Sequence, residues 1–156
     1  MCQSNNSWNL NSLKVLPLSI KNIKECKELA EIALNGMWSK NNWEKELQNS
    51  LRLSIGIFNT SKLIAIACGS VIFDELHLTS LCVHPEHRGK GIGKLVLKSL
   101  LTKAKQKGAA FATLEVATDN CAAKKLYKAF GFKTKGYRKD YYRDGKTALI
   151  QWATLE

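Results

Sequence analysis

The sequence has no apolar run approaching the ~18 residues needed to span a bilayer, and its start lacks the charged-then-apolar order of a signal peptide. Its five cysteines are odd in number and scattered, which argues against a disulfide framework and fits a reducing compartment. We therefore expect a cytoplasmic protein without a membrane span, whose cysteines are small buried hydrophobic residues. No repeat, low-complexity tract or linker is visible, so residues 1–156 are predicted to form a single domain, with about 1–11 as a flexible extension.

Acidic residues are also scarce, because 13 Asp and Glu stand against 24 Lys and Arg and leave a net charge of +11. The hydrophobic share of 45% nonetheless fits a folded domain. Such a charge attracts polyanions, and both a phosphate-bearing cofactor and RNA are candidates. The positive charge is equally consistent with lysines that simply face solvent, because many of them fall on the outer face and at the end of one predicted helix.

Two widespread phosphate-binding motifs are missing from the glycine-rich segment, residues 81–94. A Walker A loop requires a glycine where the chain has Arg88 and a hydroxyl residue where it has Leu95, and the Rossmann fingerprint requires a glycine in place of Lys94. The segment still runs from an apolar strand through three glycines into an amphipathic helix. A helix start carries unpaired N–H groups and partial positive charge, and glycines let a phosphate approach the backbone. We therefore predict a site for a phosphate-bearing cofactor.

Hydrophobic periodicity predicts both strands and helices. Strands are expected near residues 13–16, 51–57, 63–73, 76–83, 111–117, 133–142 and 147–153. Helices are expected over residues 19–35, from 39 onward, over 92–107 and over 120–130. Strand, helix and strand over residues 76–117 make a right-handed crossover, so these two strands are predicted to be parallel and central. The predicted fold class is α/β with a mixed sheet.

A fixed order of motifs begins at the glycine loop. Arg88-x-x-Gly91-x-Gly93 is followed by Leu114-Glu115-Val116, then by Asn120, then by Leu126-Tyr127-x-x-Phe130-Gly131-Phe132. Over about half of the chain this order resembles the GNAT family of N-acetyltransferases, whose Arg/Gln-x-x-Gly-x-Gly/Ala loop binds the pyrophosphate of acetyl-CoA. The resemblance implies a mixed central sheet flanked by helices on both faces, with acetyl-CoA as cosubstrate. It implies cofactor contacts at Leu81, Cys82, Val83, Arg88, Gly89, Lys90, Gly91, Ile92, Gly93, Lys94 and Asn120.

Two further segments are similar to the ribosomal-protein-alanine N-acetyltransferase group within that family. They are Met37-Trp38-Ser39, where the group has Pro-Trp-Ser, and Tyr137-Arg138-Lys139-Asp140-Tyr141-Tyr142, followed by an Asp-Gly turn. The chain departs from the group at Met37 and at Lys146-Thr147-Ala148, where Glu-Asp-Ala is usual. The resemblance implies direct transfer of the acetyl group to the N-terminal α-amine of a protein, with a ribosomal protein as the expected partner.

Two residues carry the chemistry that the resemblance implies. Glu115 would act as general base toward the acceptor amine, through a water, and Tyr127 would protonate the departing thiolate of coenzyme A. By alternation Glu115 shares a strand face with Thr113 and Ala117, where an ionised carboxylate needs a partner or water. Structural alternatives remain open: Glu115 on a solvated strand face, Tyr127 packed in the core, and Asn120 as a helix cap.

Metal and cysteine chemistry are not expected. Cys82-x-His84-x-x-His87 lacks a fourth ligand and a second pair at zinc-finger spacing, so no metal is predicted. Cys82 suits a buried strand position better than the role of an acetyl-accepting nucleophile. Two functions compete with peptide acetylation: acetylation of a small amine such as a polyamine, and a non-catalytic basic module that binds anions or RNA. The module would need neither Glu115 nor Tyr127.

Overall fold

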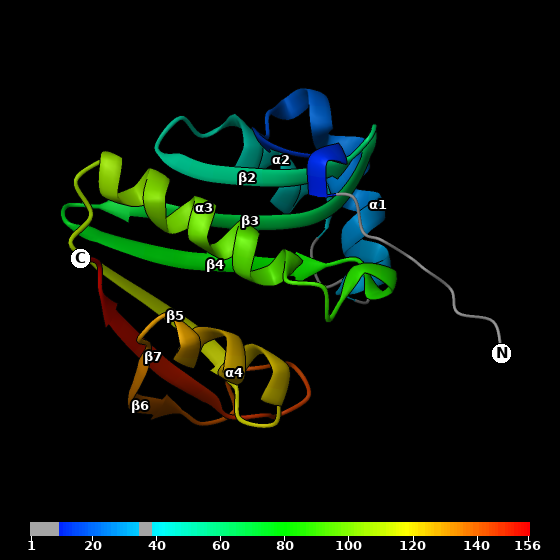
Figure 1. The fold of residues 1–156 in the computed structure, drawn as a ribbon. Coiled ribbons are helices and arrows are strands. Elements are labelled where there is room, and N and C mark those ends of the chain that lie inside the picture. The colour runs from blue at the N-terminus through cyan, green and yellow to red at the C-terminus, as the bar shows by residue number, and fades with distance from the viewer. Residues whose placement is uncertain (1–9, 35–38) are drawn as a thin grey trace, which may run out of the picture.

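Short apolar runs separated by glycine and polar turns form seven strands of one sheet, in the order β1-β2-β3-β4-β5-β7-β6 (Figure 1). The computed structural model describes residues 10–34 and 39–156. The strands are β1 Leu13–Pro17, β2 Arg52–Asn59, β3 Lys62–Ile72, β4 Glu75–Val83, β5 Phe111–Ala117, β6 Lys133–Arg138 and β7 Ala148–Thr154. Neighbouring strands are antiparallel except β4 and β5, which are parallel. The predicted α/β class, mixed sheet and parallel crossover pair are confirmed.

Helices cover both faces of the sheet. The α-helices of the described part are α1 Ile23–Ala33, α2 Lys40–Gln48, α3 Ile92–Gln106 and α4 Cys121–Ala129, and the 3-10 turns are η1 Leu10–Ser12, η2 Ile20–Asn22 and η3 Pro85–His87. In Figure 1, α3 and α4 lie over one face of the sheet, and α1 and α2 lie over the other. The predicted start at Ser39 is confirmed by its hydroxyl, which accepts from the Asn42 N–H at 3.2 Å. No helix of the described residues is long and apolar enough to cross a membrane.

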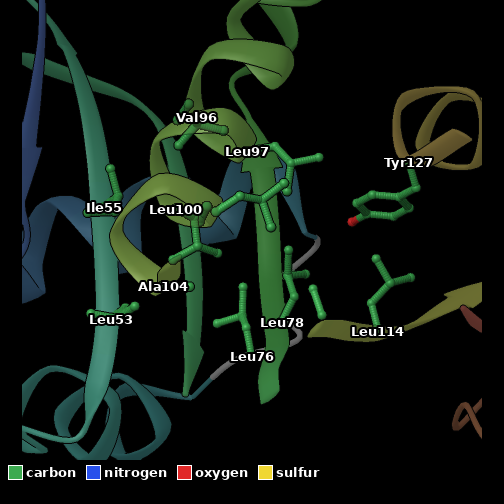
Figure 2. Close-up of a cluster of buried hydrophobic side chains, with 14 of the residues drawn as sticks. Leu53, Ile55, Leu76, Leu78, Val96, Leu97, Leu100, Ala104, Leu114 and Tyr127 are labelled. Atoms are coloured by element: carbon green, nitrogen blue, oxygen red, sulfur yellow. The ribbon is translucent and has the colours of Figure 1, made fainter. Parts of the chain in front are cut away.

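Two apolar cores lie on opposite faces of the sheet. The first packs α3 and α4 against β2 to β5 and includes Leu76, Leu100 and Leu114 (Figure 2). The second lies between the other face and helices α1 and α2, and it includes Trp43 and Cys82. Strands β2, β3 and β4 contribute side chains to both cores, whereas β5 contributes to the first core alone.

The second core also holds a charged side chain. The Glu46 side chain on α2 is 1% exposed, and its Oε2 pairs with a guanidinium nitrogen of Arg52 at the start of β2. Burial raises the pKa of the Glu46 carboxyl, although the Arg52 charge and hydrogen bond oppose that shift. This ion pair ties α2 to the start of β2.

The strand expected over residues 133–142 is shorter than predicted, because β6 ends at Arg138. Asp140 has a left-handed backbone, with φ +52°, and the Tyr142 N–H donates to the Lys146 carbonyl at 3.2 Å. Residues 139–147 therefore form a folded loop. The predicted Asp-Gly turn lies inside this loop, where Gly145 has φ +80°.

Cys26, Cys68 and Cys82 are buried as predicted, but Cys121 is exposed, because the first turn of α4 projects into solvent. Residues 10 and 11 of the expected extension belong to η1. The rest of that extension, residues 1–9 with Cys2 among them, lies outside the described residues. So do Met37 and Trp38 of the Met37-Trp38-Ser39 segment.

Candidate active site

The parallel strands β4 and β5 pair over only three residues each, from Glu75 opposite Phe111 to His77 opposite Thr113. Beyond this point the two strands diverge (Figure 1). A bulge follows at once on β4, because the β3 register runs from Leu78 directly to Ser80. Such an extra residue bends a strand. Ligands of open α/β sheets bind outside the carboxyl ends of parallel strands, and here this end is where β4 and β5 separate.

The bulge reverses the face of the sheet toward which successive β4 side chains point. Leu76 and Leu78 belong to the core beneath α3, whereas Cys82 belongs to the core beneath α1 and α2. The predicted cofactor contacts Leu81 and Val83 are half-buried and pack against the α3 core. Burial raises the pKa of the Cys82 thiol to about 12, so the thiol stays protonated and is a poor nucleophile.

The glycine loop leads from the end of β4 into α3. Gly89 has φ +74°, and Gly91, the N-cap residue of α3, has φ +82°. A Cβ on either glycine would meet no atom within 4 Å, so the space above the loop is open. The N–H groups of Ile92 and Gly93 belong to the first helical turn and have no partner within the helix. Left-handed glycines, open space and a positive helix end together fit a bound phosphate or pyrophosphate.

Two cations predicted to contact the cofactor hold the loop itself. The Arg88 guanidinium donates to the Val83 carbonyl at 3.1 Å and to the Ala33 carbonyl at the end of α1 at 3.4 Å. The Lys90 ammonium donates to the Glu86 carbonyl at 3.1 Å. These bonds fix the loop to the ends of β4 and α1. Lys94, in the first turn of α3, is exposed.

Glu115 lies on β5 two residues beyond the last β4 partner, and its side chain is 13% exposed. Its Oε2 lies 2.9 Å from Nε2 of His77, and its Oε1 lies 3.9 Å from a guanidinium nitrogen of Arg138. The expected partner of a half-buried carboxylate is therefore present. Its strand neighbour Thr113 donates to Glu75 at 2.9 Å instead. Sequence reasoning missed His77, because only the register of β4 against β5 brings it to Glu115.

Tyr127 projects from α4 on the opposite face of β5. Figure 2 shows its ring between α4 and β4, with the hydroxyl directed toward the space near Leu97 and Leu114. Burial raises the pKa of Tyr127, with a smaller contribution from Tyr142, so the phenol remains protonated at neutral pH. The Tyr127 ring also meets Phe132 edge-on, with 5.7 Å between ring centroids. The core packing considered for Tyr127 is therefore present, and its role as a proton donor stays a prediction.

Tyr142 lies in the folded loop of residues 139–147. Burial raises the pKa of Tyr142, and the charges of Tyr141, Glu115 and Asp144 raise it further. Tyr142 therefore lies within electrostatic range of both Glu115 and Tyr127.

Asn120 is the N-cap of α4, and its side-chain oxygen accepts from the Ala123 N–H at 3.1 Å. The capping role considered for it is confirmed. Beside it, the Lys146 ammonium lies 2.8 Å from the Asp119 carboxylate and 3.5 Å from that of Asp144. The hydrogen bond from Lys146 lowers the pKa of Asp119. This ion-pair cluster ties the loop of residues 139–147 to the start of α4.

The histidines after β4 do not gather around Cys82. The ligand atoms of His84, Glu86 and His87 lie within 4.8 Å of one another instead, and Nδ1 of His84 accepts the Glu86 N–H at 3.2 Å. A separate cleft of about 640 Å³ lies at the other end of α3, lined by residues that include Lys98, Lys133 and Trp152. No residue of the predicted site lines it. This cleft is therefore separate from both the glycine loop and Glu115.

Comparison with known proteins agrees with this arrangement. The model of the acetyltransferase (GNAT) family matches residues 20–132. The ribosomal protein bS18-alanine N-acetyltransferase of Escherichia coli (strain K12) is 30% identical over 115 residues, which cover 72% of this chain and 77% of that protein. A Bacillus subtilis (strain 168) protein, provisionally named for the same activity, is 30% identical over 140 residues, covering 88% and 93%.

Solved structures agree as well. The crystal structure of the E. coli ribosomal-protein-S18-alanine N-acetyltransferase has a TM-score of 0.86 and 26% identity, over 92% of this chain and 94% of that one. The fold is shared with PaiA N-acetyltransferase from Thermoplasma acidophilum in complex with coenzyme A, with a TM-score of 0.76, 23% identity and coverage of 92% and 99%. The chain belongs to the acetyltransferase (GNAT) family, whose members use acetyl-CoA as cosubstrate.

Proposed function

We propose that this acetyltransferase acts on the N-terminal α-amine of a ribosomal protein, with alanine as the first residue. The named activity of relatives at 30% identity supports this acceptor. The observation that carries the proposal is the position of two groups on opposite faces of β5. Glu115 lies on one face, whereas Leu114 and Val116 lie on the other face with Tyr127. An acceptor and a cosubstrate can therefore meet where β4 and β5 diverge.

Acetyl-CoA supplies an activated thioester carbonyl. The glycine loop would hold its pyrophosphate at the N-terminus of α3. Glu115 takes the proton that the attacking amine loses, through a water, and the Tyr127 hydroxyl gives a proton to the sulfur as the carbon–sulfur bond breaks. A carbon–nitrogen bond forms in the same transfer, so no acetylated enzyme residue is needed. The protonated, buried Cys82 thiol is consistent with direct attack.

An α-amine suits a carboxylate base of this kind. With a pKa of about 7.7–8.0 it is roughly one-tenth neutral at pH 7, whereas a lysine amine near 10.4 is neutral only about 0.04% of the time. An N-terminal amine therefore depends less on deprotonation by the base than a lysine side chain does. This difference favours N-terminal over lysine acetylation.

The charges near Glu115 disfavour a polyamine. Glu115 faces His77 and Arg138, and the carboxylates of Asp119 and Asp144 both pair with Lys146. A polyamine requires unpaired acidic groups along its path, whereas an extended peptide requires backbone partners and a small pocket. Exposed Tyr141 and half-buried Tyr142 on the neighbouring loop suit peptide contacts.

The test compares acceptors under identical acetyl-CoA concentrations. A peptide that begins with alanine, the same peptide with a blocked N-terminus and one free lysine, and spermidine are incubated with the enzyme, and products are identified by mass spectrometry. We expect the α-amine of the first peptide to be acetylated fastest. Faster turnover of spermidine than of every N-terminal peptide would overturn the acceptor assignment. Absence of turnover with all acceptors, together with salt-sensitive RNA binding, would favour the basic binding module.

A further inference from the structure

We infer that His77 is a positioning residue for Glu115, because its Nε2–H holds one carboxylate oxygen and thereby orients the other toward the acceptor. This inference rests on the proposed role of Glu115 as general base. An ionised carboxylate can only accept hydrogen bonds, so at the observed separation of 2.9 Å the hydrogen belongs to Nε2 of His77. The contact engages Oε2 and leaves Oε1 as the oxygen available to a water or an amine.

The backbone makes His77 a rigid support. It is the last β4 residue paired with β5, opposite Thr113, and it also pairs with Ser70 of β3. Glu115 is two residues further along β5, on the same face as His77, at the point where β5 loses its β4 neighbour. The imidazole therefore reaches diagonally across the end of the paired region. It supports Glu115 from a strand that is fixed on both sides.

The other groups near Glu115 cannot replace this contact. Arg138 is on the edge strand β6, is 56% exposed and lies 3.9 Å from Oε1, so it contributes charge without a hydrogen bond of normal length. Thr113 lies opposite His77 in the register, and its hydroxyl donates to Glu75 rather than to Glu115. Tyr142 lies within electrostatic range of Glu115, whose charge raises the pKa of Tyr142. His77 is thus the group that determines the direction of the carboxylate.

Replacing His77 by leucine removes the donor but keeps a side chain of comparable length. We expect His77→Leu to lower kcat about 10–100-fold, because a general base must be held close to its productive geometry. The KM for acetyl-CoA should stay the same, because the glycine loop is held by other residues. His77→Gln places an amide N–H near the position of Nε2 and should restore most of kcat. His77 is 42% exposed, so both variants should melt close to the wild-type temperature.

A double variant separates positioning from a general structural effect. In the Glu115→Gln enzyme, His77→Leu should cause no further loss of kcat, because no carboxylate remains to be oriented. Thr113→Val is the matched control, because the Thr113 hydroxyl donates to Glu75 rather than to Glu115, and it should lower kcat less than threefold. Wild-type kcat in His77→Leu, equal loss in the leucine and glutamine variants, or additive losses with Glu115→Gln would overturn the inference. If Glu115→Gln alone kept wild-type kcat, the proposed base role would fail as well, which distinguishes the two failures.

Discussion

Gly91 gives the sharpest test of the cofactor site, because a matched control lies at the other end of the same helix. Gly91 precedes α3 with φ +82°, and Gly108 follows it with φ +94°. A Cβ at either position would meet no atom within 4 Å. Asparagine tolerates the left-handed conformation better than other side chains. Gly91→Asn and Gly108→Asn should therefore each lower the free energy of unfolding by only about 1 kcal/mol.

The two variants should differ in acetyl-CoA binding. A side chain at position 91 occupies the open space at the helix N-terminus, whereas one at 108 lies beside the C-terminus. Losing about two charge-assisted hydrogen bonds to the pyrophosphate, at roughly 1.5 kcal/mol each, lowers affinity by about 100-fold. For the wild type, ligand at 100 times Kd adds about 2.7 kcal/mol of stability, or about 5–11 °C in melting temperature.

The assay is thermal unfolding of both variants at that single acetyl-CoA concentration. For Gly91→Asn the stabilisation by acetyl-CoA should fall to about 0.4 kcal/mol, which raises the melting temperature by roughly 1 °C. For Gly108→Asn the full shift should remain. Equal ligand shifts in the two variants would refute the assignment of the pyrophosphate to this helix end, whatever the effect on stability.

Four further predictions follow from individual side chains. Glu115→Gln should lower kcat by about 10²–10⁴-fold, most strongly at low pH where fewer acceptor amines are neutral, in a pH–rate profile. Tyr127→Phe should lower kcat across the pH range with unchanged acetyl-CoA affinity by calorimetry; normal turnover would leave it a packing role alone. Arg52→Met should lower the free energy of unfolding by about 3–5 kcal/mol in urea at pH 7, because it leaves the buried Glu46 carboxylate without its partner. The loss should be smaller in acid, because burial raises the pKa of the Glu46 carboxyl and it then takes up a proton. Iodoacetamide at pH 8 should alkylate exposed Cys121 and spare the three buried cysteines, as peptide mass spectrometry would show.

The cofactor loop could be predicted from sequence because its physics is local. Three glycines between a strand and an amphipathic helix indicate left-handed turns at a helix start, and the structure has them at Gly89 and Gly91. The parallel pair of β4 and β5 was predictable for a related reason, because a strand, a helix and a strand of this length have one favoured handedness. Neither inference requires knowledge of distant contacts.

The divergence of β4 and β5 could not be predicted in this way. Residues 76, 78, 80 and 82 are all buried, and strict alternation would put them on one face of the sheet. The extra residue Thr79 instead sends Leu78 and Cys82 into different cores. A bulge depends on the register with β3, which the sequence of β4 alone does not encode.

The same limit explains why the sequence pointed to Glu115 and Tyr127 but not to His77. The first two residues have a chemical type and an order along the chain that a motif can capture. His77 stands 38 residues before Glu115 and depends on the point at which the β4–β5 pairing stops. Two more paired residues would carry β4 alongside Glu115 and close the site, and one fewer would leave His77 without its β5 partner. The short parallel ladder therefore both opens the site and places the group that supports its carboxylate.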